Sequence, residues 1–145
     1  MTEPTSIYPA YYLRGISALL RRVGLPTCEV LLVPSVQEWA RSVGLDGPHP
    51  HTAGMAATRD GLPIITLCDT ITEGIRDGIV PLMELRGFGS DLNRIEDPAA
   101  FLEHLVLHEA AHLVLPDGAT DSACDTWAFE RLSGCLQPDA SDGAT

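Results

Sequence analysis

Two histidines and a glutamate lie inside one of the most apolar stretches of this sequence, LVLHEAAHLVL (residues 105–115). His108 and His112 are four residues apart, so on a helix both rings leave the same face and can reach one metal ion. Glu109, beside them, could then take a proton from a water that the metal activates. A zinc ion would also offset the cost of burying these groups. The spacing therefore predicts an HExxH zinc site with Glu109 as the general base.

A catalytic zinc site usually has a third protein ligand. Asp121 and Asp125, in DSACDTWAFERL, are also four residues apart, and the short LPDGAT segment could fold their helix back against the first one. We expect Asp121 to bind the metal and Asp125 to accept a hydrogen bond from the non-ligating nitrogen of a histidine. The alternatives are an acid favoured by the helix dipole at Asp121 and a solvated surface charge at Asp125.

Two neighbours of these residues are assigned structural roles. His104 lies four residues before His108, but about 40° further round the helix, and is expected to be a packed or surface histidine. Cys124 points away from the carboxylates and is expected in the core. For the motif as a whole, the alternative is a helix with two partly exposed histidines and a surface glutamate. The apolar flanks argue against that alternative.

Periodicity and capping signals predict the elements that must position the site. Asp97 is a plausible N-cap of the motif helix, Pro98 sits at its first position, and Pro116 ends it. Ser35 with Glu38 three residues on is a capping-box start for a short helix. The predicted helices span residues 11–23, 35–43, 98–115 and 120–132, and the predicted strands span residues 28–33, 53–58 and 62–67.

These elements predict an α+β fold, with a short, mostly antiparallel sheet packed on the HExxH helix and on the C-terminal helix that follows. The strands at 53–58 and 62–67 are predicted to form a hairpin, and Pro63 suits an edge position in the second of them. Residues 44–54 read as a loop. Residues 69–96 contain several glycines and a proline, so partial helix with loops is expected there.

Length and composition favour one domain, at 1–136, followed by a polar tail, at 137–145, that is expected to be disordered. The formal net charge is −11, and all nine cationic side chains are arginines. Such a chain repels phosphate backbones, so no direct nucleic-acid partner is expected. No apolar run approaches the roughly 20 residues of a membrane span.

The cysteines and the first residues of the sequence indicate in which cellular compartment the protein is expected. Cys28, Cys68, Cys124 and Cys135 are scattered without a CxxC pair. The first 20 residues have neither a basic region nor a long apolar region, so they do not read as a secretory signal. Both features favour free thiols and a cytoplasmic protein.

The segment HEAAHLVLPDGATDSACDTWAFERL resembles the core of the ImmA/IrrE-type metallopeptidases, which are gluzincin-like enzymes. That family typically shows ExxA[ND]xFA on the helix after HExxH, and its Glu is the third zinc ligand. Asp121 takes the place of that Glu, Cys124 of the small Ala, and Asp125 of the Asn/Asp. Trp127 stands for the aromatic residue and Ala128 for the final Ala. The shorter Asp121 is a departure, because it must approach the metal more closely than a Glu.

The resemblance implies a zincin-like fold and zinc-dependent hydrolysis of a peptide bond, with a polypeptide substrate such as a transcriptional regulator. In the family an extended substrate binds along an edge strand, and residues 64–67 are expected to supply that edge. His49, His51 and Tyr8 are available to stabilise the oxyanion, and nothing in the sequence chooses among them.

Two other readings stay open. One is a deformylase-like hydrolase in which Cys68 is the third ligand, although the other motifs of that family are missing. The other is a catalytically weak or inactive zincin-like binding module with a structural metal. Two histidines and a carboxylate do not by themselves distinguish zinc from manganese or iron, and the sequence leaves the oligomeric state open.

Overall fold

The computed structural model describes residues 6–45, 52–134 and 136–139 of the 145-residue chain. Three residues singled out above, His49, His51 and Cys135, lie outside the described residues, as do residues 140–145 of the expected tail. Within the described part, the protein is a small α+β domain with five α-helices and a three-stranded mixed sheet.

Four of the five α-helices agree closely with the expected ones: α1 (Leu13–Arg22), α2 (Val36–Ser42), α4 (Pro98–Val114) and α5 (Asp121–Arg131). The fifth, α3 (Glu73–Met83), lies in the segment 69–96, where only partial helix was expected. The expected caps form: Ser35 Oγ accepts from the backbone N–H of Glu38, and Asp97 accepts from those of Ala99 and Ala100. No helix among the described residues has the length and apolar character to cross a membrane.

Residues 69–96 hold more helix than their glycines and proline suggested. α3 continues for 11 residues through Gly74, Gly78 and Pro81. Its first turn is capped by Thr72, whose hydroxyl accepts from the backbone N–H of Ile75. Short turns of π and 3-10 helix follow, η2 (Glu84–Phe88) and η3 (Gly89–Ile95), and a further 3-10 turn, η1 (Pro9–Tyr12), precedes α1.

The sheet is mixed rather than mostly antiparallel. Its strands are β1 (Glu29–Val33), β2 (Gly54–Arg59) and β3 (Leu62–Cys68), in the order β1-β3-β2. β2 and β3 form the expected antiparallel hairpin, but β1 pairs with β3 in parallel. The parallel pair arises because the chain passes from β1 through α2 to the far edge before the hairpin returns it beside β1.

This order corrects two expectations about β3. Its residues 64–67 pair with β1 on one side and β2 on the other, so they offer no free edge to a peptide. Pro63 therefore lies on the central strand, not on an edge strand. It pairs with Thr58 of β2, and pairing with β1 begins only at Ile64. Pro63 lacks a backbone N–H, and it lies just before the point where β3 begins to pair with its second neighbouring strand, β1.

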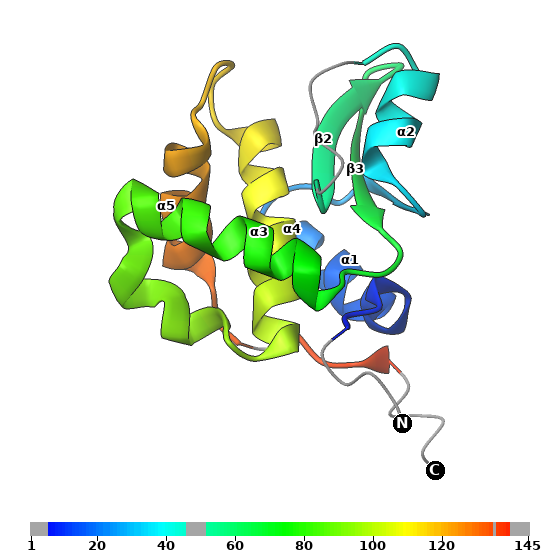
Figure 1. Ribbon diagram of the computed structural model, residues 1–145. Coiled ribbons are helices and arrows are strands. Elements are labelled where there is room, and N and C mark those ends of the chain that lie inside the picture. The colour runs from blue at the N-terminus through cyan, green and yellow to red at the C-terminus, as the bar shows by residue number, and fades with distance from the viewer. Residues whose placement is uncertain (1–5, 46–51, 135, 140–145) are drawn as a thin grey trace.

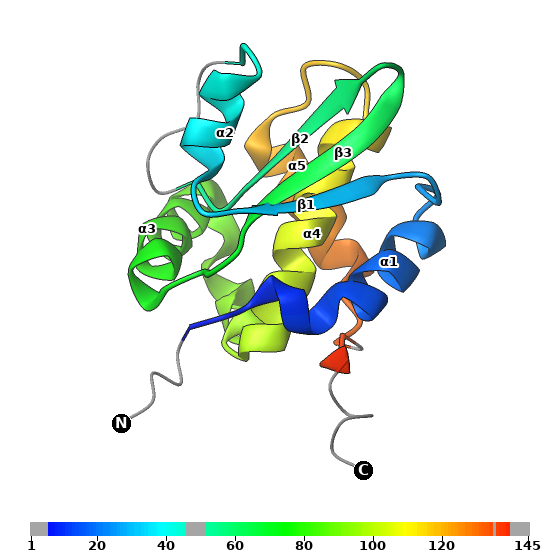
Figure 2. The same cartoon turned by 90° about the vertical axis from the view of Figure 1, so that its right-hand side faces the viewer.

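α4 runs through the middle of the molecule, with the sheet on one side and α5 on the other (Figure 1). α2 covers the opposite face of the sheet, and α1 packs beside α4 (Figure 2). Most of α4 is buried, including Leu102, Val106 and Ala110. A helix covered on several sides needs apolar residues around most of its circumference, which explains the apolar run around the motif.

Candidate metal centre

The two histidines of the motif come from the last turns of α4. His108 and His112 have ring centroids 5.1 Å apart, and their side chains are 14% and 33% exposed. Both rings therefore lie at the same face of the helix, where solvent can reach them. This placement is the one that the four-residue spacing predicts.

Asp121, at the first position of α5, meets both rings. Its Oδ1 lies 3.3 Å from the Nε2 of His108 and 3.3 Å from the Nε2 of His112. The side chain is short, but the buried face of α5 includes the small residues Cys124 and Ala128, and small residues let helices approach closely. Thr120 caps α5 by accepting from the backbone N–H of Ala123, which fixes where the helix begins.

The donor atoms of these three side chains lie close to one another. One ligand atom from each of His108, His112 and Asp121 lies within 4.8 Å of the others, so the group could hold a metal ion. Ligands about 2.0–2.1 Å from a tetrahedral zinc are about 3.3 Å from one another, and both oxygen–nitrogen distances have that value. In the described part of the chain, Cys68 is not in the group; its thiol donates to the carbonyl of Thr52 instead.

Asp125 lies one turn after Asp121 and is almost fully buried, with its side chain 1% exposed. Its Oδ1 is 2.7 Å from the Nδ1 of His108. The geometry is therefore the one expected of a carboxylate that orients a metal-binding histidine through its other nitrogen. It differs from the alternative of a solvated surface charge.

Charge pairing sets the protonation of this group in the metal-free protein. Burial acts to lower the pKa of His108, but hydrogen bonds with Asp121 and Asp125 outweigh it and raise the pKa to about 10. The hydrogen bond with His108 holds the pKa of Asp121 below its usual range. Burial acts to raise the pKa of Asp125, but the pairing with His108 prevails and lowers it.

Glu109 is the buried acid of the motif, 7% exposed. Burial raises its pKa against the opposing effect of His108 and His112. β2 also borders the Glu109 side chain: a Cβ built on Gly54 would lie 3.3 Å from the Cγ of Glu109. Glu109 thus lies between the two histidines and β2, one of the edge strands of the sheet. A raised pKa favours proton acceptance, as a general base requires.

Arg86, in η2, also belongs to the site, and sequence reasoning missed it. Its Nη1 donates to Asp125 Oδ2 at 2.9 Å, and its Nη2 lies 3.6 Å from Asp121 Oδ2. The signal was weak, because Arg86 is one of nine arginines and lies in the segment whose structure was hardest to predict. The neighbouring Gly87 has a φ of 98°, a backbone conformation that favours glycine and turns the chain at this point.

Two other residues fall where a structural role fits them. His104 is 2% exposed and packs on Phe129, with ring centroids 4.3 Å apart. Burial lowers the pKa of His104 to about 4, so it is neutral at physiological pH. Cys124 is fully buried. Both are therefore packed side chains, as expected.

Tyr8, the remaining candidate for stabilising an oxyanion, stacks obliquely on Tyr11, with ring centroids 5.7 Å apart. The ring contact that the described structure gives Tyr8 is therefore with Tyr11, and not with the histidines of the metal group.

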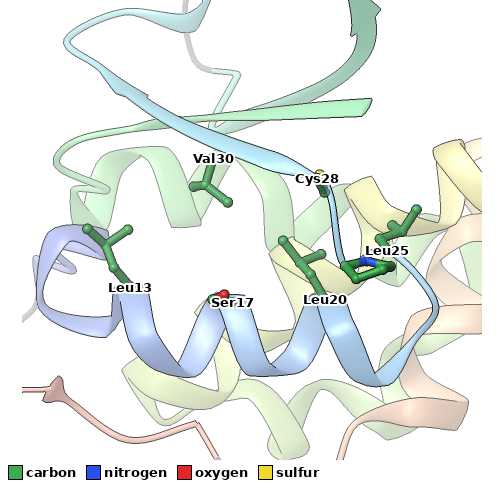
Figure 3. Close-up of a pocket in the computed structure, with 7 residues that line it drawn as sticks. Leu13, Ser17, Leu20, Leu25, Cys28 and Val30 are labelled. Atoms are coloured by element: carbon green, nitrogen blue, oxygen red, sulfur yellow. The ribbon is translucent and has the colours of Figure 1, made fainter. Parts of the chain in front are cut away.

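Two surface hollows lie apart from the histidines. One, of about 210 Å³, opens between α1 and β1 and is lined by Leu13, Ser17, Leu20, Leu25, Pro26, Cys28 and Val30 (Figure 3). The other, of about 350 Å³, lies between α2 and the hairpin. Neither is lined by a residue of the metal group, so the candidate site is identified by its donor atoms rather than by a deep cavity.

In comparisons with known proteins, no family model, no curated protein and no solved structure matches this chain. The candidate function therefore depends on the residues of the site and their geometry.

Proposed function

We propose that this protein is a zinc-dependent metallopeptidase, as the resemblance to the ImmA/IrrE-type enzymes implies. The observation that carries the proposal is the approach of Asp121 Oδ1 to within 3.3 Å of Nε2 on both His108 and His112. Two imidazoles and one carboxylate leave a fourth place for water, which is the donor set of a catalytic zinc site.

The residues of the site have different roles in this proposal. His108, His112 and Asp121 would hold the metal, which supplies a more acidic water and polarises the scissile carbonyl when bound. Glu109 would accept a proton from the attacking water as the water oxygen bonds to the carbonyl carbon, and would pass that proton to the amine nitrogen as the C–N bond breaks. Asp125 accepts the hydrogen bond from His108 Nδ1 and so presents Nε2 to the metal.

The substrate in this proposal is a polypeptide in extended conformation. β2 is one of the two edge strands of the described sheet, and it is the one that contacts α4 most. A peptide that adds to β2 as a further strand would pass close to Glu109, since Gly54 of β2 borders that side chain. The resemblance favours a regulator protein over bulk polypeptide. Cytoplasmic location belongs to the same proposal.

The test has two parts. The first measures the zinc content of purified wild-type protein, Asp121→Ala and Cys68→Ala. About one zinc per chain that is lost only in Asp121→Ala supports the site; loss only in Cys68→Ala would favour the deformylase-like alternative. The second part compares wild type with Glu109→Gln on a mixture of denatured polypeptides, with new termini detected by mass spectrometry. A peptidase keeps its zinc and loses cleavage in Glu109→Gln.

A second candidate is a zincin-like binding module with a structural metal. It is favoured by the ion pairs among His108, Asp121, Asp125 and Arg86, because they link α4, α5 and η2 to one another around the metal group, as a structural site would. In this case Glu109→Gln would bind a partner as well as the wild type does. A wild type that cleaves nothing and a variant that matches it in every assay would leave only this second candidate.

A further inference from the structure

Arg86 lies across both carboxylates of the candidate site. Its segment, η2, follows α3, and the guanidinium reaches α5 from there. The side chain is 29% exposed, so it lies at the rim of the site rather than in the core. It contacts Asp125 Oδ2 at 2.9 Å and approaches Asp121 Oδ2 at 3.6 Å.

The two carboxylates divide their oxygens in the same way. Oδ1 of Asp121 faces the two Nε2 atoms, and Oδ1 of Asp125 faces Nδ1 of His108. In both residues Oδ2 faces Arg86. One guanidinium therefore occupies the oxygens that the histidines leave free.

From this division we propose that Arg86 is a positioning residue that keeps Asp121 a one-oxygen ligand of the metal; this rests on the proposed metal site. A carboxylate can bind a cation through one oxygen or through both. Binding through both would raise the coordination number and fill space that a catalytic site keeps open for water and substrate. Arg86 holds Oδ2 away from the metal and leaves only Oδ1 for it.

The chemistry of arginine suits this role. Its planar guanidinium presents several N–H groups in a fixed geometry, so Nη1 and Nη2 can serve two different carboxylates at once. A lysine ammonium is a compact charge on a flexible chain and does not fix two oxygens in this way. The positive charge also offsets the repulsion between the two acids, which lie one turn apart on α5.

Metal affinity alone would test the proposal poorly. Loss of the positive charge of Arg86 favours a nearby cation, whereas loss of its hydrogen bonds loosens the ligands, so the two effects oppose each other. Coordination number is the direct readout. Co²⁺ in place of zinc reports it, because four-coordinate Co²⁺ absorbs visible light much more strongly than five- or six-coordinate Co²⁺.

The experiment loads wild type, Arg86→Ala, Arg86→Lys and Arg41→Ala with Co²⁺, and records visible spectra at matched metal content. Arg41 is an exposed arginine on α2, across the sheet from the site. We expect an intense band in wild type and Arg41→Ala, and a fall of roughly two-fold or more per bound Co²⁺ in both Arg86 variants. Arg86→Lys keeps the charge beside buried Asp125 and so gives a folded variant if Arg86→Ala does not fold.

An unchanged band in a folded Arg86 variant would overturn the proposal, and so would a wild type that binds no Co²⁺. The same measurements distinguish failure of the role of Arg86 from failure of the proposed peptidase function. If Co²⁺ binds and the band falls as expected but no polypeptide is cleaved, Arg86 positions a ligand in a binding module. If wild type cleaves but the band is unaffected by Arg86→Lys, the peptidase proposal stands without this role for Arg86.

Discussion

His108 Nδ1 and Asp125 Oδ1 lie 2.7 Å apart, and the carboxylate that makes this contact is buried. The contact fixes the orientation of the ring and leaves Nε2 facing Asp121 Oδ1. It joins α5 to α4 at the point where the metal ligands converge. Asp125 thus connects the packing of the two helices to the geometry of the candidate metal group.

Replacing Asp125 with Asn should weaken zinc binding by about 10–100-fold, because partners of this kind orient a ligating histidine and raise its basicity. Competition with a chromophoric chelator measures the change. Asp117→Asn is the matched control, since Asp117 is an exposed acid in the loop before α5. Equal affinities in wild type and Asp125→Asn would contradict this role.

The pairing of His108 makes the metal-free protein sensitive to pH. The pKa of His108 is raised from 6.5 to about 10 in the folded state, against the effect of burial, by Asp121 and Asp125. Above pH 6.5 the folded state therefore binds more protons than the unfolded state, and the free energy of unfolding falls as pH rises. Glu109 acts in the same direction because burial raises its pKa. His104, with its pKa lowered to about 4, acts in the opposite direction, mainly below pH 6.5.

We expect the free energy of unfolding to fall by roughly 2 kcal/mol between pH 6.5 and 8.5 when a chelator keeps the protein free of metal. Urea unfolding at the two pH values measures it. In His108→Gln most of this slope should disappear. A wild-type stability that is constant or rises over this range would show that His108 is not protonated in the fold.

Much of the site could be predicted from sequence because its parts are local. The four-residue spacings of His108 with His112 and of Asp121 with Asp125 fix shared helix faces, and a short loop brings the two helices together. The bounds of α4 could be predicted for the same reason, from the N-cap residue Asp97 and from the apolar residues on both sides of the motif. The hairpin of β2 and β3 was also local, since its turn at Asp60 and Gly61 has positive φ at both residues.

The parts that could not be predicted depend on distant contacts. Sheet order requires knowing which strands meet, and alternation along β3 does not distinguish a central strand from an edge strand. Arg86 reaches Asp125 across 39 positions of the sequence, from a segment with no regular period. Glycines and a proline suggested interruptions in α3, but the helix runs unbroken from a capped start at Thr72, with Ile75, Ile79 and Val80 partly buried against the core.

Gly54 of β2 lies so close to Glu109 that a larger residue at this position would crowd the Glu109 side chain. A Cβ there would lie 3.1 Å from Leu67 Cδ2 and 3.3 Å from Glu109 Cγ. Gly54→Ala should therefore lower the free energy of unfolding by about 1 kcal/mol and reduce turnover, with zinc content unchanged, because Glu109 must shift. Unfolding in urea and cleavage rates measure the two effects.

Gly78 provides the contrast for that variant, since a Cβ there meets nothing within 4 Å. Gly78→Ala, in α3, should raise the free energy of unfolding by about 0.5–1 kcal/mol and leave turnover unchanged. If both alanine variants stabilise the protein equally, the crowding between Gly54 and Glu109 does not restrict the site.

Glu103 is a fully buried carboxylate of α4 that ties the chain after α5 to the core. It accepts hydrogen bonds from the backbone N–H of Ser133 at 2.9 Å, the hydroxyl of Ser133 at 3.1 Å and the backbone N–H of Leu136 at 3.3 Å. Glu103→Gln puts an N–H₂ group where one of these acceptors was. The variant should lose about 1.5–3 kcal/mol of unfolding free energy, measured in urea, because buried donors lose a charged partner.

Zinc content should not change in Glu103→Gln, because the residue lies more than one helical turn before His108 and contacts the C-terminal segment instead. Glu130→Gln is the control. The Glu130 side chain is 66% exposed and pairs with the neighbouring Arg131 at the surface, so its loss should change the free energy of unfolding by less than about 0.5 kcal/mol. A Glu103→Gln variant that is as stable as Glu130→Gln would mean that the segment after α5 is held by its apolar contacts, such as buried Leu136, rather than by this carboxylate.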